Sequence, residues 1–183
     1  ILMLLDAIHY LPDVLSRRRE IVRQLYFGGI KSFGAVSVVA LFSGMILSLQ
    51  MGLELRRYGQ EVTVGAIVAT FMCREFGPFM TGLILAATIG SAMAAELGTM
   101  SVSEEVASLE VMSISPGSFL VMPRLVAFAL VCPILTVYTN VLGIFGGGIV
   151  ASSQLDVTPV AYYHSARQLV ENRELYVGLL KAF

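Results

Sequence analysis

The residues best suited to chemistry are two adjacent charges, Arg74 and Glu75, inside an otherwise apolar stretch. Ionisable side chains are costly at membrane depth, so those found there mark candidate functional sites. Successive residues on a helix diverge by about 100°, and we therefore expect the two side chains not to pair with each other. Each would instead face a cavity, a lipid headgroup or a partner charge. The alternative is that this point of the chain lies at the membrane interface, where both side chains are solvated.

A second candidate is the polar stretch 101–113, which carries Glu104, Glu105 and Glu110. Four apolar residues recur there at spacings of three or four: Val102, Val106, Leu109 and Met112. This periodicity predicts a short amphipathic helix outside the bilayer core. Such a helix can dock in the groove of a partner protein and carry motion into the spans. A plain surface helix lying on the headgroups would show the same pattern.

Small residues form a third pattern, because they recur every four positions. They are Ala86, Gly90, Ala94 and Gly98, followed further along the chain by the pair Gly143 and Gly147. Small side chains let two helices approach closely in lipid, where no hydrophobic driving force brings helices together. Structural packing is one interpretation of these positions and a subunit or gating interface is the other, and spacing alone does not separate them.

Other kinds of chemistry lack the residues that they need. His9 and His164 are isolated, and Cys73 and Cys132 lie in apolar stretches without metal spacing or a disulfide framework. The sequence contains no phosphate-binding G-x-x-x-x-G-K-[ST] loop, no H-E-x-x-H and no G-x-S-x-G. We therefore expect this chain to have no catalytic residue, no metal site and no bound cofactor. Any ATP and Mg²⁺ would be bound by a partner ATPase.

The composition indicates that these residues belong to a membrane protein. Of the 183 residues, 56% are hydrophobic and 14% are charged, against about 25% charged in soluble domains. The mean hydropathy is +0.80. The uncharged run 32–53 would cover about 33 Å as a helix, enough for a hydrocarbon core of about 30 Å. These values exclude a soluble globular protein. A net charge of −1 also lacks the excess of basic residues that a nucleic-acid-binding protein needs to bind phosphates.

The elements that position the candidate residues are predicted to be helices throughout. The fold class is all-α and polytopic, with complete spans at 32–53, 76–95 and 125–150 and the start of a fourth at Leu175. The apolar stretch 62–95 exceeds one bilayer thickness as a single helix. It would tilt, project beyond the membrane, or break near Gly77-Pro78, where proline removes a backbone donor. We expect a charged hairpin at 54–61 and a polar connection at 156–173.

The N-terminal segment 1–30 combines apolar residues at helical spacing with a cluster of arginines. It is predicted to be a helix in the membrane interface, with a solvated basic linker as the alternative. Lys and Arg favour a cytoplasmic N-terminus by six to four. Because the chain starts at Ile1 and the apolar segment Leu175 to Phe183 is too short to span, we expect a piece of a longer protein.

Several of these residues also carry a resemblance to a known family. Arg74-Glu75-Phe76-Gly77-Pro78, Gly90-Ser91-Ala92 and the stretch from Ala95 to Met100 resemble the signature of the MlaE-type permeases. These are membrane subunits of ABC transporters associated with MCE proteins. The match continues through Ser103-Glu104-Glu105-Val106, Leu109-Glu110-Val111-Met112, Ser115-Pro116 and Pro123-Arg124, and it covers most of 20–150.

The resemblance implies a non-catalytic permease subunit that forms a homodimer in the bacterial inner membrane. It implies two cytoplasmic ATPase subunits, a periplasmic MCE-domain protein, and movement of phospholipid or a related lipid between the membrane and that protein. The segment 101–113 would be the coupling helix, and 1–30 an elbow helix, of a single permease domain over 1–183. The residues implied for ATPase coupling are Glu104, Glu105, Leu109 and Glu110. Those we assign to the lipid path are Leu49, Met51, Leu53, Arg74 and Glu75.

Two residues depart from the family pattern. Many relatives carry an arginine where this chain has Thr88, and many carry glutamine where it has Glu105. A role for that arginine does not transfer to this chain, and the extra carboxylate predicts a basic pocket on the ATPase. Two other functions stay open. One is a secondary transporter or channel without an ATPase, and the other is a scaffold that tethers a partner without moving lipid.

Overall fold

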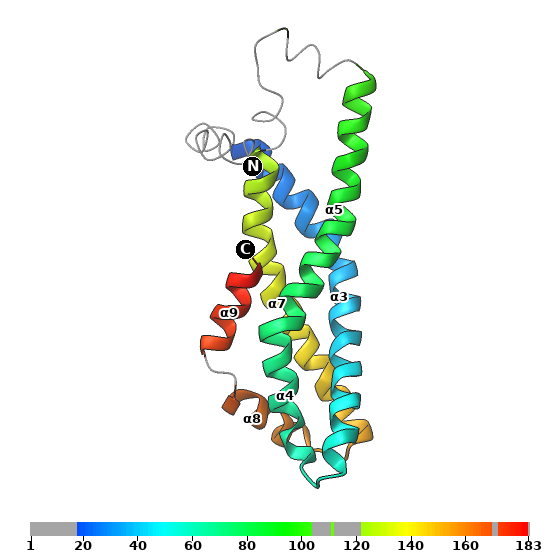
Figure 1. Ribbon diagram of the computed structural model, residues 1–183, viewed down its shortest axis with the longest axis vertical. Helices are drawn as coiled ribbons and strands as arrows, with labels where there is room; N and C mark the ends of the chain where they lie inside the picture. The colour runs from blue at the N-terminus through cyan, green and yellow to red at the C-terminus, as the bar shows by residue number, and fades with distance from the viewer. Residues whose placement is uncertain (1–17, 104–110, 112–121, 170–171, 183) are drawn as a thin grey trace. The chain divides into compact units, whose positions relative to one another are not determined.

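The computed structural model describes residues 18–103, 111, 122–169 and 172–182, and all its regular elements there are helices (Figure 1). The long helices are α3 (Arg18–Arg56), α5 (Gly77–Val102) and α7 (Met122–Gln154). The shorter ones are α4 (Val64–Phe71), α8 (Pro159–Leu169) and α9 (Asn172–Ala182), with a 3₁₀ turn at Glu61–Thr63 and a π-helical segment at Met72–Phe76. The predicted all-α class is confirmed.

Three stretches are long and apolar enough to cross a membrane: Ser32–Arg56, Glu61–Val102 and Val126–Gln154. They confirm the three predicted spans. The second stretch begins earlier than the predicted 76–95 and continues through Glu96 to Val102. It contains the π-helical segment Met72–Phe76 directly before Gly77-Pro78, so the helix changes its hydrogen-bonding pattern beside the proline but does not end there.

Within the described residues, α3 is continuous from Arg18 through the expected boundary near residue 31. Residues 1–17, most of the expected elbow helix, lie outside the described part of the chain. The elbow therefore stays a prediction.

The chain divides into two compact units, which we describe separately. The first comprises 1–32 and 85–131. In it, α3 and α5 are joined by a hydrogen bond between the hydroxyls of Ser32 and Thr88, 3.1 Å apart. Thr88 thus contacts α3 within this unit.

The second unit comprises 33–84 and 132–183, and its core centres on Tyr162 of α8. Tyr162 is fully buried among residues of α4 and α7, and its hydroxyl donates a hydrogen bond to the carbonyl oxygen of Ile144 at 3.2 Å. Burial raises the pKa of this phenol, which therefore stays protonated. Figure 1 shows α8 beside α4. A Cβ added to Gly65 of α4 would overlap the carbonyl oxygen of Tyr162, so glycine permits this close packing.

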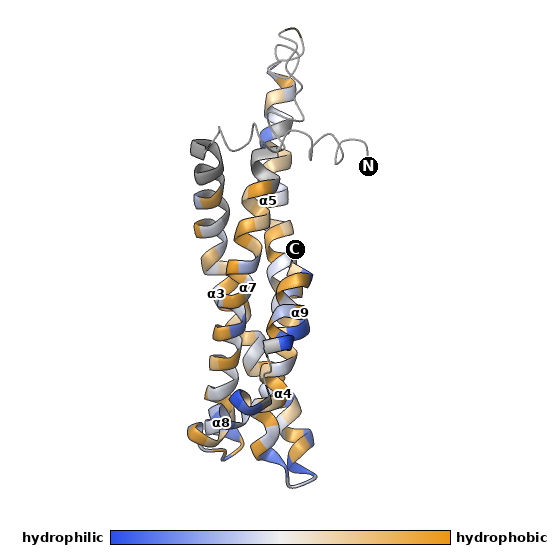
Figure 2. Cartoon of the chain, turned by 90° about the vertical axis from the view of Figure 1, so that its left-hand side faces the viewer, coloured by the Kyte–Doolittle hydropathy of each residue, from blue (hydrophilic) through white to orange (hydrophobic). Residues whose placement is uncertain are grey.

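Helices α3 and α7 of the second unit also meet through glycines. A Cβ on Gly44 would overlap the carbonyl oxygen of Gly143, and one on Gly146 would overlap that of Leu41. The backbones are therefore in contact, as small residues permit in lipid. On the other side of α3, large apolar residues such as Phe42 and Ile46 are exposed. Figure 2 shows hydrophobic residues along α3 and hydrophilic ones in the turn that leads to α4.

Helix α8 lies in the stretch that we predicted to be a polar connection. Its start carries a recognisable signal, because Pro159 is the first helical residue and Thr158 precedes it. The hydroxyl of Thr158 accepts a hydrogen bond from the backbone N–H of Ala161 at 3.4 Å, as an N-cap does.

Candidate functional site

The candidate site is built on the π-helical segment Met72–Phe76, which follows from the local sequence. An α-helix would require the N–H of residue 78 to bond the carbonyl of Arg74, and Pro78 has no N–H. The proline ring would also crowd that carbonyl. The wider turn, in which the N–H of Gly77 bonds the carbonyl of Met72, accommodates the proline. Single π-helical turns occur frequently at functional sites.

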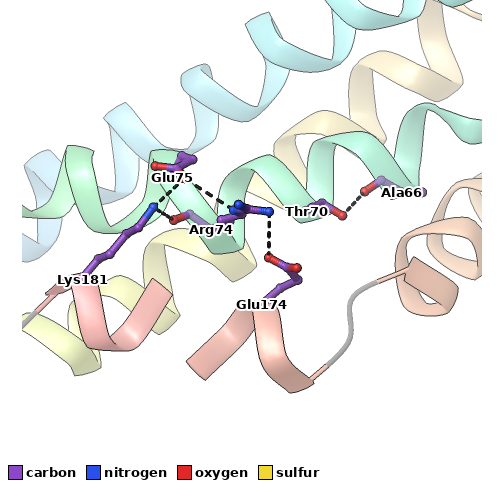
Figure 3. Close-up of polar contacts among 6 residues, drawn as sticks. All are labelled: Ala66, Thr70, Arg74, Glu75, Glu174 and Lys181. Atoms are coloured by element: carbon purple, nitrogen blue, oxygen red, sulfur yellow. Dashed lines mark hydrogen bonds and ion pairs between the residues drawn. The ribbon is translucent and has the colours of Figure 1, made fainter. Parts of the chain in front are cut away.

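Lys181 of α9 supplies a donor that Pro78 cannot. Its ammonium group lies 3.4 Å from the carbonyl oxygen of Arg74 and in direct contact with the Glu75 carboxylate (Figure 3). One cation therefore binds both a backbone carbonyl and a side chain of the π-helical segment.

The sequence of α9 places three residues against this turn. Glu174, Gly178 and Lys181 follow one another at spacings of four and three, so they share one face of the helix. A Cβ on Gly178 would overlap the carbonyl oxygen of Cys73. The glycine thus lets α9 approach the backbone of the π-helical segment, with the two charged residues on either side.

The four charged side chains form a network without net charge. Arg74 contacts Glu75, with 3.6 Å between Nε and Oε1, and Glu174, with 3.8 Å between Nη1 and Oε2 (Figure 3). Lys181 completes it through Glu75. Two cations and two anions compensate one another, which lowers the cost of holding charge in a span. Arg74, Glu75 and Lys181 are about half exposed, so their outer surfaces remain accessible to a ligand.

Of the alternative surroundings expected for Arg74 and Glu75, partner charges are present, and both side chains are also about half exposed. One prediction is wrong, because Arg74 and Glu75 do contact each other. The angle of about 100° between successive helical residues describes only the directions of their Cα–Cβ bonds. Both side chains are long enough to bend toward each other, and each is also drawn toward an opposite charge on α9.

The other residues assigned to the lipid path lie at the end of α3. Leu49 and Leu53 are exposed, whereas Met51 packs against the core around Tyr162. The described ion pairs of Arg74 and Glu75 are made with each other and with α9, and none comes from α3.

The predicted packing residues fall into two groups. Gly143 and Gly147 are buried in the second unit, where a Cβ on the first would overlap Met72 and one on the second would lie 2.5 Å from the Tyr162 hydroxyl. The stripe on α5 is exposed, comprising Ala86, Gly90, Ala94 and Gly98. Added Cβ atoms on Gly90 and Gly98 would meet nothing within 4 Å among the described residues. An interface along this stripe stays a prediction.

The residues assigned to ATPase coupling lie outside the described residues: Glu104, Glu105, Leu109 and Glu110. Their role stays a prediction. Both cysteines are free, and the described residues contain no group of three or more His, Cys, Asp or Glu side chains placed to hold a metal ion.

Sequence reasoning missed Glu174 and Lys181 as site residues. Lys181 carried a usable signal, because it is a charge in an apolar segment, the criterion that selected Arg74 and Glu75. Glu174 had a weaker signal, which was its spacing of seven residues, or two helical turns, from Lys181.

Three apolar candidate spans, the second of which carries Arg74 and Glu75 paired with charges on α9, define a polytopic helical membrane protein. Residues 21–183 match the model of the MlaE permease family. The chain belongs to this family, which confirms the resemblance drawn from its motifs.

The names of three similar proteins agree with the assignment to this family. A probable ABC transporter permease protein of Rickettsia prowazekii is 36% identical over 162 residues, covering 88% of this chain and 62% of the relative. The intermembrane phospholipid transport system permease protein MlaE of Haemophilus influenzae is 30% identical over 181 residues, covering 98% of this chain and 69% of the relative. The chloroplastic protein TRIGALACTOSYLDIACYLGLYCEROL 1 of Arabidopsis thaliana is 30% identical over 164 residues, covering 90% of this chain and 47% of the relative. This chain thus spans about two thirds or less of the length of these relatives.

Proposed function

We propose that this chain is part of the permease subunit of an ABC transporter that moves phospholipid or a related lipid between membranes. The observation that carries the proposal is the compensated charge network that joins the π-helical segment of the second span to α9, in a chain of the MlaE family. The lipid class follows from the name of the Haemophilus influenzae relative. The chain itself is non-catalytic, and a separate cytoplasmic ATPase supplies the energy.

The network suits a headgroup that carries both charge signs. Arg74 and Lys181 can bind phosphate oxygens, while Glu75 can bind an ammonium group. Because each charge already has a partner, a lipid would exchange one ion pair for another. Such an exchange avoids leaving a charge unpaired at membrane depth, and it permits release as well as binding.

We further propose a homodimer in the bacterial inner membrane with a cytoplasmic N-terminus, an MCE-domain partner on the periplasmic side, and 101–113 as the coupling helix. Support for the dimer comes from the exposed small-residue stripe on α5, where Cβ atoms added to Gly90 and Gly98 would meet none of the described residues within 4 Å. Support for the partners comes from the family and from the transport-system name of the relative.

The transport proposal is tested with the full-length protein and its ATPase in liposomes, by following transfer of a labelled phospholipid. Lys181→Met removes both contacts to the π-helical segment, whereas Lys181→Arg keeps the charge and a donor. We expect Lys181→Met to slow transfer about tenfold and Lys181→Arg to retain most of it. The matched control is Arg57→Gln, which among the described residues breaks one exposed ion pair, with Glu54 at the end of α3. Wild-type transfer by correctly inserted Lys181→Met would contradict the assignment.

The coupling assignment has its own test. The double variant Glu104→Lys with Glu105→Lys reverses the charge expected to face the ATPase. It should abolish lipid-stimulated ATP hydrolysis while leaving membrane insertion intact. Unchanged stimulation would remove these residues from the coupling role.

A secondary transporter is the second candidate function, because the same four charges and the π-helical irregularity in the second span could serve a transporter without an ATPase. Lipid transfer that continues without ATP would favour it.

A further inference from the structure

The second unit contains a groove that the charge network does not use. A cavity of about 370 Å³ lies between α4, α7, α8 and α9, within the size range of small-molecule sites. Its apolar walls come from all four helices and include Ala69, Val137, Ile144, Ala166 and Leu175. None of the four charged residues of the network lines it. The groove is open on its outer side, since Val137 and Val141 of α7 are exposed.

We expect the open side of this groove to face the lipid bilayer and not water. Val137 and Val141 belong to the candidate span Val126–Gln154. An apolar groove open toward a bilayer is filled by hydrocarbon more favourably than by water, because water there would lack hydrogen-bonding partners.

Two polar residues in the same cavity distinguish it from a plain apolar gap. Asn140 is 4% exposed, and its amide oxygen is buried without a hydrogen-bonding partner among the described residues. That oxygen lies against Gly77, where an added Cβ would overlap it, and Gly77 does not line the groove. The NH₂ group of the same amide can donate a hydrogen bond to an ester or phosphate oxygen.

Arg167 provides the charge at this groove. It is exposed on α8 and forms no ion pair with the residues that the structure describes, whereas Arg56, Arg57, Arg74 and Lys181 all do. A guanidinium group matches the geometry of a phosphate and carries its charge at every relevant pH.

We propose that this groove binds one anionic phospholipid from the surrounding bilayer, as a resident lipid distinct from the transported one. One acyl chain occupies the apolar walls, the phosphate is bound by Arg167, and Asn140 donates to an oxygen of the ester or phosphate group. The bound lipid fills the space between α8, α9 and the two spans they pack against. It thereby supports the position of α9, whose face carries Glu174 and Lys181.

The test uses the full-length protein in mild detergent, equilibrated with vesicles of phosphatidylglycerol or of phosphatidylcholine. Lipid that stays bound is counted by native mass spectrometry. We expect one tightly bound phosphatidylglycerol per chain and about tenfold weaker retention of phosphatidylcholine. Arg167→Gln should remove this preference while leaving the protein folded. Val141→Trp should block the groove from its open side and reduce retention of both lipids. The control is Arg57→Gln, which removes an exposed cation elsewhere in the unit.

A photo-crosslinking residue at Val141 separates the possible occupants. Attachment to lipid supports the proposal, whereas attachment to another part of this protein or to a second copy overturns it. Equal retention of both lipids by wild type, or undiminished retention by Arg167→Gln and Val141→Trp, would also overturn it. Lipid transfer by the ATPase-driven complex is a separate readout, because the resident lipid can be absent while the transport assignment stands.

Discussion

Replacing Gly44 with alanine tests whether α3 and α7 are in backbone contact. The added Cβ would overlap the carbonyl oxygen of Gly143 and lie 2.7 Å from its Cα. Non-bonded carbon atoms pack at about 3.5–4.0 Å, so the helices must separate locally by about 1 Å. Neither backbone atom can rotate away. Such overpacking costs about 1–3 kcal/mol, against a gain of about 0.5–1 kcal/mol for alanine over glycine in a helix interior.

Gly34→Ala is the matched control for this prediction. Gly34 lies on the same helix and is exposed, and a Cβ there would meet nothing within 4 Å among the described residues. It carries the same gain in helix propensity without the overlap. Gly44→Ala should therefore be less stable than Gly34→Ala by about 1–3 kcal/mol in the free energy of unfolding.

The assay is denaturant unfolding in detergent micelles, followed by circular dichroism. A comparison of two variants on one helix cancels the common effects of detergent and of the unfolded state. Equal unfolding free energies would refute the backbone contact, and with it the role of glycine in setting the distance between these spans.

Three further predictions concern α8 and α9. Tyr162→Phe removes the hydrogen bond to Ile144 and should lower the free energy of unfolding by about 1 kcal/mol. Because burial raises the pKa of Tyr162 above its ordinary value, wild type should lose stability as the pH rises above about 10, and Tyr162→Phe should lose less, in alkaline unfolding curves. Thr158→Ala removes the cap of α8 and should cost about 1 kcal/mol in chemical unfolding, whereas Thr158→Ser should be nearly neutral. Gly178→Leu should push α9 from the carbonyl of Cys73 and slow lipid transfer as Lys181→Met does, and unchanged transfer would contradict the close packing.

The spans were predictable because hydrocarbon thickness fixes their length. An uncharged run such as 32–53 has one favourable arrangement in a bilayer, and the structure has a candidate span there from Ser32 to Arg56. An irregularity near Gly77-Pro78 was one of the expected alternatives for a similarly local reason, since Pro78 removes one specific donor. Its π-helical form, in which the helix continues, was not predictable, because several local geometries relieve the same clash.

The partners of the network were not predictable, since Lys181 lies 106 residues from Glu75 in the chain. Periodicity places residues on a face of one helix, but it does not say which face of a distant helix packs there. Helix α8 was missed for another reason. Its composition is mixed and its apolar periodicity short, so only the cap at Thr158 and the proline at 159 mark it.

The contact between Lys181 and the carbonyl of Arg74 makes two distant positions evolutionarily interdependent. Proline at 78 creates the need for an outside donor, and lysine at 181 meets it. A chain that lost the proline would form an unbroken α-helix, with an N–H at 78 for that carbonyl, and lysine at 181 would keep only its contact with Glu75. A chain that lost the lysine first would leave the carbonyl without this donor. The order in which substitutions arise therefore matters, and the path through loss of the proline is the more permissive one.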